Sequence, residues 1–455
     1  MKKLKKSVLV KFFLILSLGL VFFNCKKKKS NNDQTVTTQP VPAPVSDITI
    51  QGMDADEIVL TGTLIEEIET ENVTLKIPYF GATVGVYPEV SFNSTHVLGL
   101  TATLPAGEIT AAGNGFFILN ISGTPDLAAD AFFNITIAGI TVKVEVPVQV
   151  LQRTVSTFYN FGATGCSPVS IIKSEGDFYV SCLSGKGIVK ISGNGNSLVL
   201  IQVLSGLIPT AIYGLAMGED GFLYASAPQY RVVFKINVNT GAYTIFAGAQ
   251  GVSGNVDGLG NAARFNTPSE IEFDLEGNLI VADQGNRNVR KITPAGLVST
   301  LIPAPTGTPA FGNGSLLNPS SVDITKSVYY VGDNLGISAF NPITQILSPF
   351  AGQNVAGDVD GIGLAAQFRG IYGVELNKAQ THLYLCDATA GKIKKILIRN
   401  RQVTTIAGTT NGTLIDGAAT TARFNIPLGL WLDDDGTIYI TDQNNKAIRM
   451  VKPVL

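Results

Sequence analysis

Short runs in which hydrophobic and polar residues alternate recur along much of this chain. The clearest is Thr141–Val150 (TVKVEVPVQV), which places valine at positions 142, 144, 146, 148 and 150. A strict period of two is typical of a strand that buries one face. Four strand-like runs precede it, separated by Gly, Pro and Asn: Glu57–Thr63, Asn72–Ile77, Gly115–Ser122 and Phe132–Ile137. Short strands with turn residues between them predict an antiparallel β-sandwich over residues 48–152.

Farther along the chain, the signature Asp-Gly-x-x-x-x-Ala-x-Phe occurs three times, at Asp257–Phe265, Asp360–Phe368 and Asp416–Phe424. Each copy follows an Ala-Gly pair and precedes a strand-like run that ends in Asp. A signature that recurs about every 50 to 100 residues predicts a repeat architecture.

From residue 154 the strand pattern can be aligned in six units, each with four expected strands. The first hairpins of the units end at Gly176–Val180, Gly221–Ala225, Gly277–Val281, Ser327–Val331, Gln380–Leu385 and Gly436–Ile440. The sixth unit stops at Leu455 without a fourth strand, whereas Val155–Phe158 has the missing pattern. An N-terminal strand that completes the last unit closes a ring and removes an open sheet edge. We therefore predict an all-β chain in which a six-bladed β-propeller, residues 153–455, follows the sandwich.

The third unit carries Phe-Asn-x-Pro, then Asp-x-x-Gly-Asn-Leu-Ile-Val-Ala-Asp-x-x-Asn and Val-Arg-Lys-Ile, within Phe265–Ile292. This motif closely resembles the NHL-repeat family of β-propellers, most strongly in units three, five and six. Because NHL-type propellers commonly serve as interaction platforms, the resemblance implies a binding role. The sandwich looks immunoglobulin-like in pattern alone, since the core cysteine pair and tryptophan of that fold are absent.

Charge excludes one class of partner. Residues 1–24 contain five lysines and no acidic residue, so the rest of the chain has a formal charge of −7 against −2 for the whole. An acidic protein lacks the electrostatic footprint that nucleic acid requires.

The N-terminus is typical of an exported lipoprotein. Met1–Lys6 is basic and Phe12–Phe23 is apolar, a run too short to span a membrane comfortably, so residues 1–24 are predicted to be a signal peptide. Cys25 stands where a bacterial lipoprotein signal places its lipidated cysteine, and the residues before it resemble the looser spirochaete form. Residues 25–47 are expected to be a disordered tether, in which acyl chains and Lys26–Lys29 together anchor the protein. We expect a cell-envelope location, in the outer membrane; an ordinary signal peptide or an uncleaved anchor is the alternative.

The other cysteines suggest structural roles. Cys166 and Cys182 flank a predicted hairpin near its open end. An exported protein permits a disulfide there, although the predicted register places the two cysteines diagonally. Cys386 lies in an apolar run and is expected in the core.

One position of the aligned inner strands is a candidate ligand site. It holds Ser170, Gly214, Glu270, Ser321, Gly373 and Gly429, and Tyr213 and Tyr372 adjoin two of the glycines. Glu270 is the only charged residue among the six. Near a propeller channel it could bind a cation such as calcium or a polar ligand, or be solvated by channel water.

Two further sets of acidic residues are interpreted as scaffold. Asp358-Val359-Asp360-Gly361 contains a fragment of calcium-loop spacing, but we favour an Asp-Gly turn with the Phe packed between blades as the explanation of the signature. The strand-end residues Asp283, Asp333, Asp387 and Asp442 recur in most units and are expected to tie down the next loop.

Two functions remain open. The chain has only two histidines, His96 and His382, too few for a histidine-rich zinc site, and His382 lies in an apolar strand. We therefore favour an envelope-anchored, non-enzymatic binding or scaffolding lipoprotein with a protein or carbohydrate partner. The alternative is a calcium-dependent hydrolase that resembles lactonase-type propellers, with Glu270 as a channel ligand.

Overall fold

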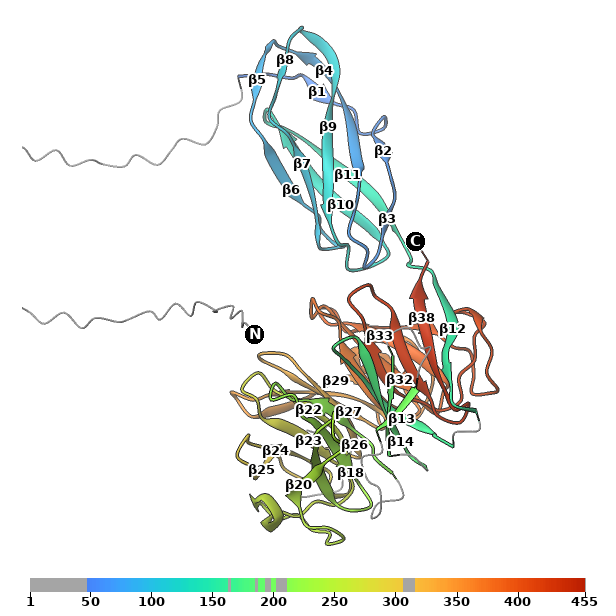
Figure 1. Ribbon diagram of the computed structural model, residues 1–455. Coiled ribbons are helices and arrows are strands. Elements are labelled where there is room, and N and C mark those ends of the chain that lie inside the picture. The colour runs from blue at the N-terminus through green and yellow to red at the C-terminus, as the bar shows by residue number, and fades with distance from the viewer. Residues whose placement is uncertain are drawn as a thin grey trace, which may run out of the picture. The chain divides into compact units, whose positions relative to one another are not determined.

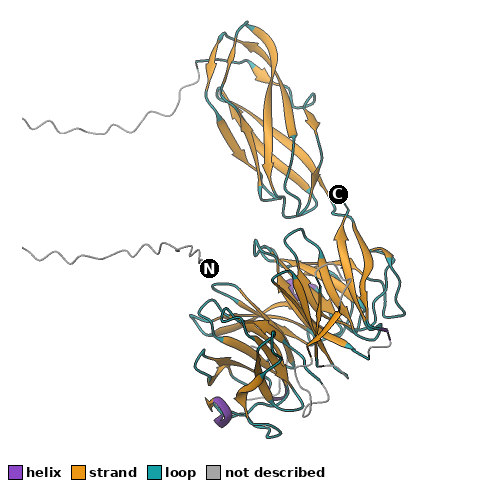
Figure 2. Ribbon diagram, viewed as in Figure 1, coloured by secondary structure: helices purple, strands orange, loops and turns teal. Residues whose placement is uncertain are grey.

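The computed structural model describes residues 47–162, 165–184, 187–192, 198–201, 211–305 and 316–454. The predicted signal peptide, Cys25 and the tether up to residue 46 lie outside these ranges. Within them, no helix is long and apolar enough to cross a membrane. Ser46–Leu455 form one compact unit, which is built almost entirely of strands (Figures 1 and 2).

The first part of this unit is a β-sandwich. One sheet has the order β1-β4-β9-β7-β6, with β2 also paired to β4, and the other has the order β10-β11-β3. The strands of the first sheet are β1 (Gly52–Met53), β2 (Val59–Thr61), β4 (Val73–Ala82), β6 (Val90–Asn93), β7 (Leu100–Leu104) and β9 (Gly113–Gly123). Those of the second are β3 (Leu64–Ile65), β10 (Asp130–Ile137) and β11 (Ile140–Gln149), while β5 (Gly85–Tyr87) pairs with β8 (Gly107–Ile109). Both sheets contribute to a single apolar core.

The valine pattern explains the orientation of β11. Val142, Val144, Val146 and Val148 are buried in the core shared with the other sheet, as their spacing predicts. Val150 differs from the expectation, since β11 ends at Gln149 and Val150 is 60% exposed. The buried face therefore stops one alternation earlier than the sequence suggests.

The described residues after 152 form six sheets, each with four main strands. The first three sheets contain β13 (Pro168–Ser174), β14 (Asp177–Cys182), β15 (Ile188–Ile191) and β16 (Leu198–Ile201); β17 (Leu215–Met217), β18 (Leu223–Ala227), β19 (Val232–Ile236) and β20 (Tyr243–Gly248); and β22 (Pro268–Phe273), β23 (Leu279–Asp283), β24 (Asn288–Ile292) and β25 (Leu297–Ile302). The next two contain β26 (Pro319–Ile324), β27 (Tyr329–Asp333), β28 (Gly336–Asn341) and β29 (Ile346–Gly352); and β31 (Ile371–Leu376), β32 (His382–Asp387), β33 (Lys392–Leu397) and β34 (Gln402–Ala407). The last contains β36 (Pro427–Leu432), β37 (Ile438–Asp442), β38 (Ala447–Pro453) and β12 (Arg153–Asn160).

The six sheets close into a ring. Strand β12 pairs antiparallel with β38, with Val155 opposite Val451, so the strand that follows the sandwich completes the last sheet. The first strands contact one another in the cyclic order β13, β17, β22, β26, β31, β36 and again β13. This closed arrangement is that of a β-propeller, and we refer to it below as the propeller.

Glycine is required where the first strands approach each other most closely. A Cβ on Gly214 would lie 2.7 Å from Cα of Glu270, one on Gly373 would lie 2.4 Å from the Leu428 carbonyl oxygen, and one on Gly429 would lie 2.5 Å from that of Val169. The small residues at this aligned position are thus a steric requirement of the ring.

The repeated Asp-Gly signature covers sheet edges and fills gaps between sheets. Its Gly begins a short strand that pairs with the outermost strand: β21 (Gly258–Leu259) with β25, β30 (Gly361–Ile362) with β34, and β35 (Gly417–Ala418) with β12. Its Phe, at 265, 368 and 424, is fully buried among residues of two successive sheets. The structural interpretation of the signature is therefore confirmed.

The cysteines lie in the scaffold. Cys166 and Cys182 are joined by a disulfide with their Cα atoms 5.1 Å apart. Cys182 pairs with Pro168 in the ladder, so the offset expected from the sequence is present and the bond bridges it. Cys386 is a free, buried cysteine, as expected of a core residue.

Candidate functional site

The strand-end and Asp-Gly carboxylates form ion pairs within the propeller. The buried Arg290 guanidinium contacts Asp257 at 2.5 Å and Asp283 at 3.4 Å. Arg449 repeats this arrangement in the last sheet with Asp416 and Asp442. These carboxylates therefore hold the third strand of each sheet to the loop beside it.

The fragment with calcium-loop spacing has protein cations as partners. Lys394 Nζ lies 3.1 Å from Asp358 and 2.6 Å from Asp360, and Lys392 contacts Asp358 at 2.5 Å. Lys394 is buried, and it takes the position on its third strand that Arg290 and Arg449 take on theirs. An ammonium group thus occupies the position that a metal ion would need.

Glu270 lies among the first strands of the propeller. Its Oε1 accepts a hydrogen bond from Ser170 Oγ at 3.0 Å. Burial raises the pKa of Glu270 to about 7, although the hydrogen bonds from Ser170 and from the backbone N–H groups of Leu215 and Ile271 lower it. At neutral pH this carboxyl can therefore both hold and release a proton.

Tyr213 and Tyr372 belong to a different environment. Both pack on an apolar cluster that contains Val169 and Leu428. Burial, and to a lesser degree the phenol of Tyr372, raises the pKa of Tyr213. The two tyrosines are thus grouped together, while Glu270 bonds to Ser170.

Three carboxylates on the first strands were missed in the sequence. Glu272, Asp323 and Glu375 occupy one aligned position on three successive first strands, two residues beyond that of Glu270. Burial raises the pKa of Glu272 to about 8 and that of Asp323 to about 6, and it raises that of Glu375 well above its usual value. Repulsion from Asp323 adds to the shift at both glutamates. In the alignment of the first strands that marks Glu270, these three acidic residues share the position two residues farther along.

Glu270 does not belong to a cluster of metal-ligating side chains in the described residues. Across the described ranges, no group of three or more His, Cys, Asp or Glu side chains is arranged to hold a metal ion. Asp323 instead accepts hydrogen bonds from the backbone N–H groups of Ile324 and Leu376.

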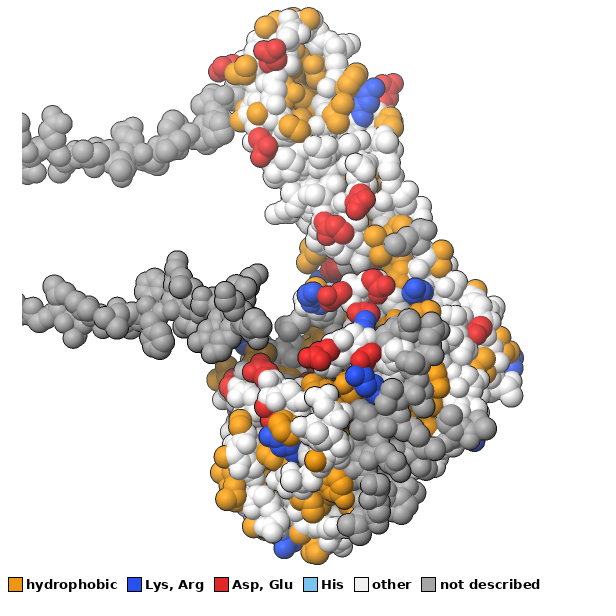
Figure 3. Space-filling view, viewed as in Figure 1, with side chains coloured by type: hydrophobic (Ala, Val, Ile, Leu, Met, Phe, Trp, Pro, Cys, Tyr) orange, Lys and Arg blue, Asp and Glu red, His pale blue; other side chains and the backbone are white. Residues whose placement is uncertain are grey.

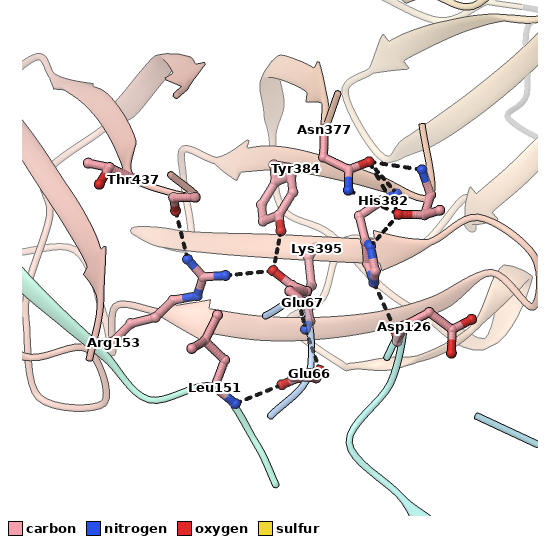
Figure 4. A network of polar contacts seen from close by, with 12 residues as sticks. Glu66, Glu67, Asp126, Leu151, Arg153, Asn377, His382, Tyr384, Lys395 and Thr437 are labelled. Carbon is pink, nitrogen blue, oxygen red and sulfur yellow. Dashed lines mark hydrogen bonds and ion pairs between the residues drawn. The ribbon is translucent and has the colours of Figure 1, made fainter. Parts of the chain in front are cut away.

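A second polar cluster joins the sandwich to the propeller (Figure 4). Glu66 and Glu67 directly follow β3 of the sandwich, and both accept hydrogen bonds from Lys395 Nζ on β33. Glu67 also accepts one from Arg153 at 2.7 Å and one from the Tyr384 hydroxyl at 2.5 Å. We call Glu66, Glu67, Arg153, Tyr384 and Lys395 the junction clamp.

The clamp balances its own buried charges. Burial alone would raise the pKa of Glu67, but the positive charges of Lys395 and Arg153 outweigh it and lower that pKa to about 2. Glu66 and Lys395 are buried, and their ion pair is 2.7 Å long. Two carboxylates thus face two cations in a region shielded from water.

His382 has a role that the sequence did not reveal. It is 2% exposed, and its Nε2 lies 3.1 Å from the backbone carbonyl oxygen of Asp126 in the sandwich. Its Nδ1 lies 3.0 Å from Thr381 Oγ1. Burial lowers its pKa, so the ring is neutral at pH 7. Beside it, the Asp126 carboxylate pairs with Arg399.

Next to the clamp lies a cavity of about 760 Å³, which we call the junction cavity. The sandwich contributes residues 67–69, 98–99 and 124–126 to its lining, and the propeller contributes 377–382, 397–399 and 432–436. In Figure 3, acidic and basic side chains gather on the visible face where these two parts meet. Nothing local in the sequence marks this site, because its segments are hundreds of residues apart.

Sequence comparison relates part of this chain to a protein that contains NHL repeats. No family model matches the chain. It is 35% identical over 97 residues to NHL repeat-containing protein 2 of Bos taurus, and 32% identical over 105 residues to the chloroplastic protein SUPPRESSOR OF QUENCHING 1 of Arabidopsis thaliana. These matches cover 21% and 23% of this chain but only 13% and 10% of the relatives, so the chain spans a small part of either.

Solved structures resemble almost the whole chain. A structural genomics protein of unknown function from Bacteroides thetaiotaomicron has a TM-score of 0.55 at 16% identity and covers 91% of this chain and 99% of its own. An auxiliary nutrient binding protein from Bacteroides ovatus has a TM-score of 0.52 at 13% identity, with coverages of 88% and 98%. At such identities the likeness shows the fold alone. Together the comparisons support an NHL or β-propeller family.

Proposed function

We propose that this protein is a non-enzymatic binding protein of a bacterial cell envelope, and that the junction cavity is its binding site. In this proposal the ring is a six-bladed NHL-type propeller, the preceding part is an Ig-like sandwich, and a lipid on Cys25 anchors the chain, in the outer membrane. The partner is a protein or a carbohydrate, part of which enters the cavity.

The junction cavity is the observation that carries the proposal. Its volume of about 760 Å³ falls within the range of ligand pockets, which form preferentially at interfaces between domains. The buried clamp next to it fixes both of its walls. The name of the similar auxiliary nutrient binding protein also supports a binding role.

A variant that fills the cavity tests this proposal. Ala379 lines the cavity and is exposed, so Ala379→Trp is expected to abolish ligand binding without unfolding the protein. Ala242→Trp, at an exposed turn outside the lining, is the matched control. Full-length protein would be screened on glycan arrays and against envelope proteins. Ligands that bind both variants as well as the wild type would refute the proposed site.

Lipid anchoring has its own test. Cells that express the wild type are expected to incorporate radioactive palmitate into the protein, and Cys25→Ser is expected to remove the label. Absence of label from the wild type would refute the anchor and leave the cavity proposal untouched.

A second function rests on Glu270. A carboxyl with a pKa raised to about 7 can exchange a proton at neutral pH, as general acid–base catalysis requires. The alternative is therefore a lactonase-type hydrolase, with calcium dependence as its distinguishing property. Calorimetric titration of calcium and a panel of lactones, each with Glu270→Gln alongside, test it. Turnover that is lost in Glu270→Gln would favour the hydrolase over the binding protein.

A further inference from the structure

The walls of the junction cavity carry an excess of negative charge. The lining contains six acidic residues, Glu67, Glu69, Asp126, Asp433, Asp434 and Asp435, and three permanently basic ones, Arg153, Lys378 and Arg399. His382, which also lines it, is neutral at pH 7 because burial lowers its pKa. The type of ligand depends on which of these charges already have partners.

Every basic side chain of the lining already pairs with a carboxylate. Arg153 pairs with Glu67, and Arg399 pairs with Asp126. Lys378 pairs with Asp434 at 2.9 Å. No cation of the lining is therefore without a carboxylate partner.

Cations outside the lining neutralise one more of its carboxylates, Asp433, and the neighbouring Glu66. Lys395 completes the charge balance of Glu66 and Glu67, and Lys173 contacts Asp433 at 2.5 Å. After these pairings, Glu69 and Asp435 remain.

Glu69 and Asp435 are left with hydrogen bonds from uncharged groups. Glu69 accepts them from the Gly123 N–H at 3.2 Å and the Thr124 hydroxyl at 2.6 Å, and Asp435 accepts one from the Thr437 N–H at 2.9 Å. Lys452 and Lys173 are near enough to help lower the pKa of Asp435. Among the described residues, however, neither carboxylate has an ion pair within 4.0 Å, and both residues are exposed.

The rest of the lining is largely apolar. Ile68 and Leu98 contribute from the sandwich, and Ile398, Leu432 and Pro453 contribute from the propeller. None of these five side chains is fully buried, and Leu98 is 45% exposed. A ligand that covers them gains from the removal of apolar surface from water.

We infer that the junction cavity binds an organic cation: the part of the partner that enters it has an apolar body and carries a positively charged nitrogen. The body covers the apolar walls, and the nitrogen compensates Glu69 on the sandwich side and Asp435 on the propeller side. This inference rests on the proposed function, because it presupposes that the cavity is a binding site.

Dansylcadaverine is a suitable probe, since it joins a fluorescent naphthalene body to a primary amine. Its N-acetyl derivative keeps the body and removes the charge. Fluorescence titration of the full-length protein is expected to show the amine binding about tenfold more tightly than the acetylated compound, a preference that falls in 1 M NaCl. Glu69→Gln and Asp435→Asn are each expected to weaken amine binding about two- to fivefold and to leave the acetylated compound unaffected. Glu145→Gln, an exposed acid on β11 outside the lining, is the control.

The outcomes separate the inference from the proposal beneath it. Equal affinity for both compounds, lost in Ala379→Trp, would overturn the cation preference and leave the cavity as a binding site. Binding that Ala379→Trp does not change would overturn both. No binding of the amine at all would overturn the inference.

Discussion

Lys395 of the propeller holds two neighbouring carboxylates of the sandwich. Its ammonium group is the shared partner of Glu66 and Glu67, and the residue is only 6% exposed. In Lys395→Met the aliphatic stem stays and the charge goes, which leaves two buried carboxylates with Arg153 as their one cation. Removal of one partner of a buried pair typically costs about 3–5 kcal/mol. Because Arg153 and Tyr384 still hold Glu67, we expect a loss of about 2–4 kcal/mol.

The single tryptophan allows unfolding of the propeller to be followed separately from unfolding of the whole protein. Trp431 is the only tryptophan of the chain and lies on β36 of the propeller, so its fluorescence reports the propeller, whereas far-UV circular dichroism reports both parts. In the wild type both signals should change together in urea. In Lys395→Met we expect a lower midpoint for the dichroism and a separation of the two curves.

A second substitution tests the charge argument itself. Glu66→Gln removes one of the two carboxylates, so in the Lys395→Met background it should recover part of the lost stability. As a single change it should destabilise, because it breaks the ion pair with Lys395. Coincident curves with an unchanged midpoint in Lys395→Met would refute the view that the clamp couples the two parts.

Two further predictions concern the propeller alone. Burial raises the pKa of Glu272 to about 8 in the folded protein from an ordinary 4.5, so the folded state binds more protons and its stability falls as pH rises from about 4.5 to 8. Glu272→Gln should therefore raise the free energy of unfolding at pH 8 by about 1–3 kcal/mol, after allowance for the partial exposure of Glu272. At pH 4 it should leave that free energy nearly unchanged, and thermal melts at both pH values would measure the difference. Arg449→Met should cost about 3–5 kcal/mol, because it leaves the fully buried carboxylate of Asp442 without its ion pair, and urea unfolding followed by Trp431 fluorescence would measure the loss.

Each of these predictions has a simple control. Glu219 is an exposed acid of the propeller, so the effect of Glu219→Gln on the free energy of unfolding should be the same at pH 4 and at pH 8. Arg423→Met, also exposed, should have little effect beside Arg449→Met. Equal effects of control and test variant would contradict the assigned role of burial.

The propeller could be predicted because its determinants are local and repeated. The period of two, the Asp-Gly signature and the pattern of Val155–Phe158 lie within short stretches, and each appears in the structure as a strand, an edge cover or a ring closure. Glu270 was found by the same alignment. Glu272, Asp323 and Glu375 occupy the next inward position of that alignment, so the sequence pattern marks these carboxylates as well.

The junction could not be predicted from the sequence in the same way. Glu66 and Lys395, whose side chains meet at 2.7 Å, are 329 residues apart. In the sequence, Glu66-Glu67 has the composition of an exposed acidic turn, and Lys395 repeats a basic residue that recurs in other third strands. Their partners follow only from the way in which the sandwich and the propeller meet, and the periodicity of the strands does not determine that contact.

The chemistry of the clamp suits a cavity that must keep its dimensions. A purely apolar contact between sandwich and propeller would give comparable stability, but apolar contacts are non-directional and tolerate sliding. Glu67 instead accepts hydrogen bonds from groups on β12, β32 and β33, so rotation of the sandwich would leave a buried carboxylate without partners, at a cost of several kcal/mol. The carboxylates of Glu69 and Asp435, which stand on opposite parts, keep a constant separation only if that rotation is prevented. A single charged nitrogen can compensate both carboxylates only while that separation is kept, so the clamp and the proposed cation preference belong to one arrangement.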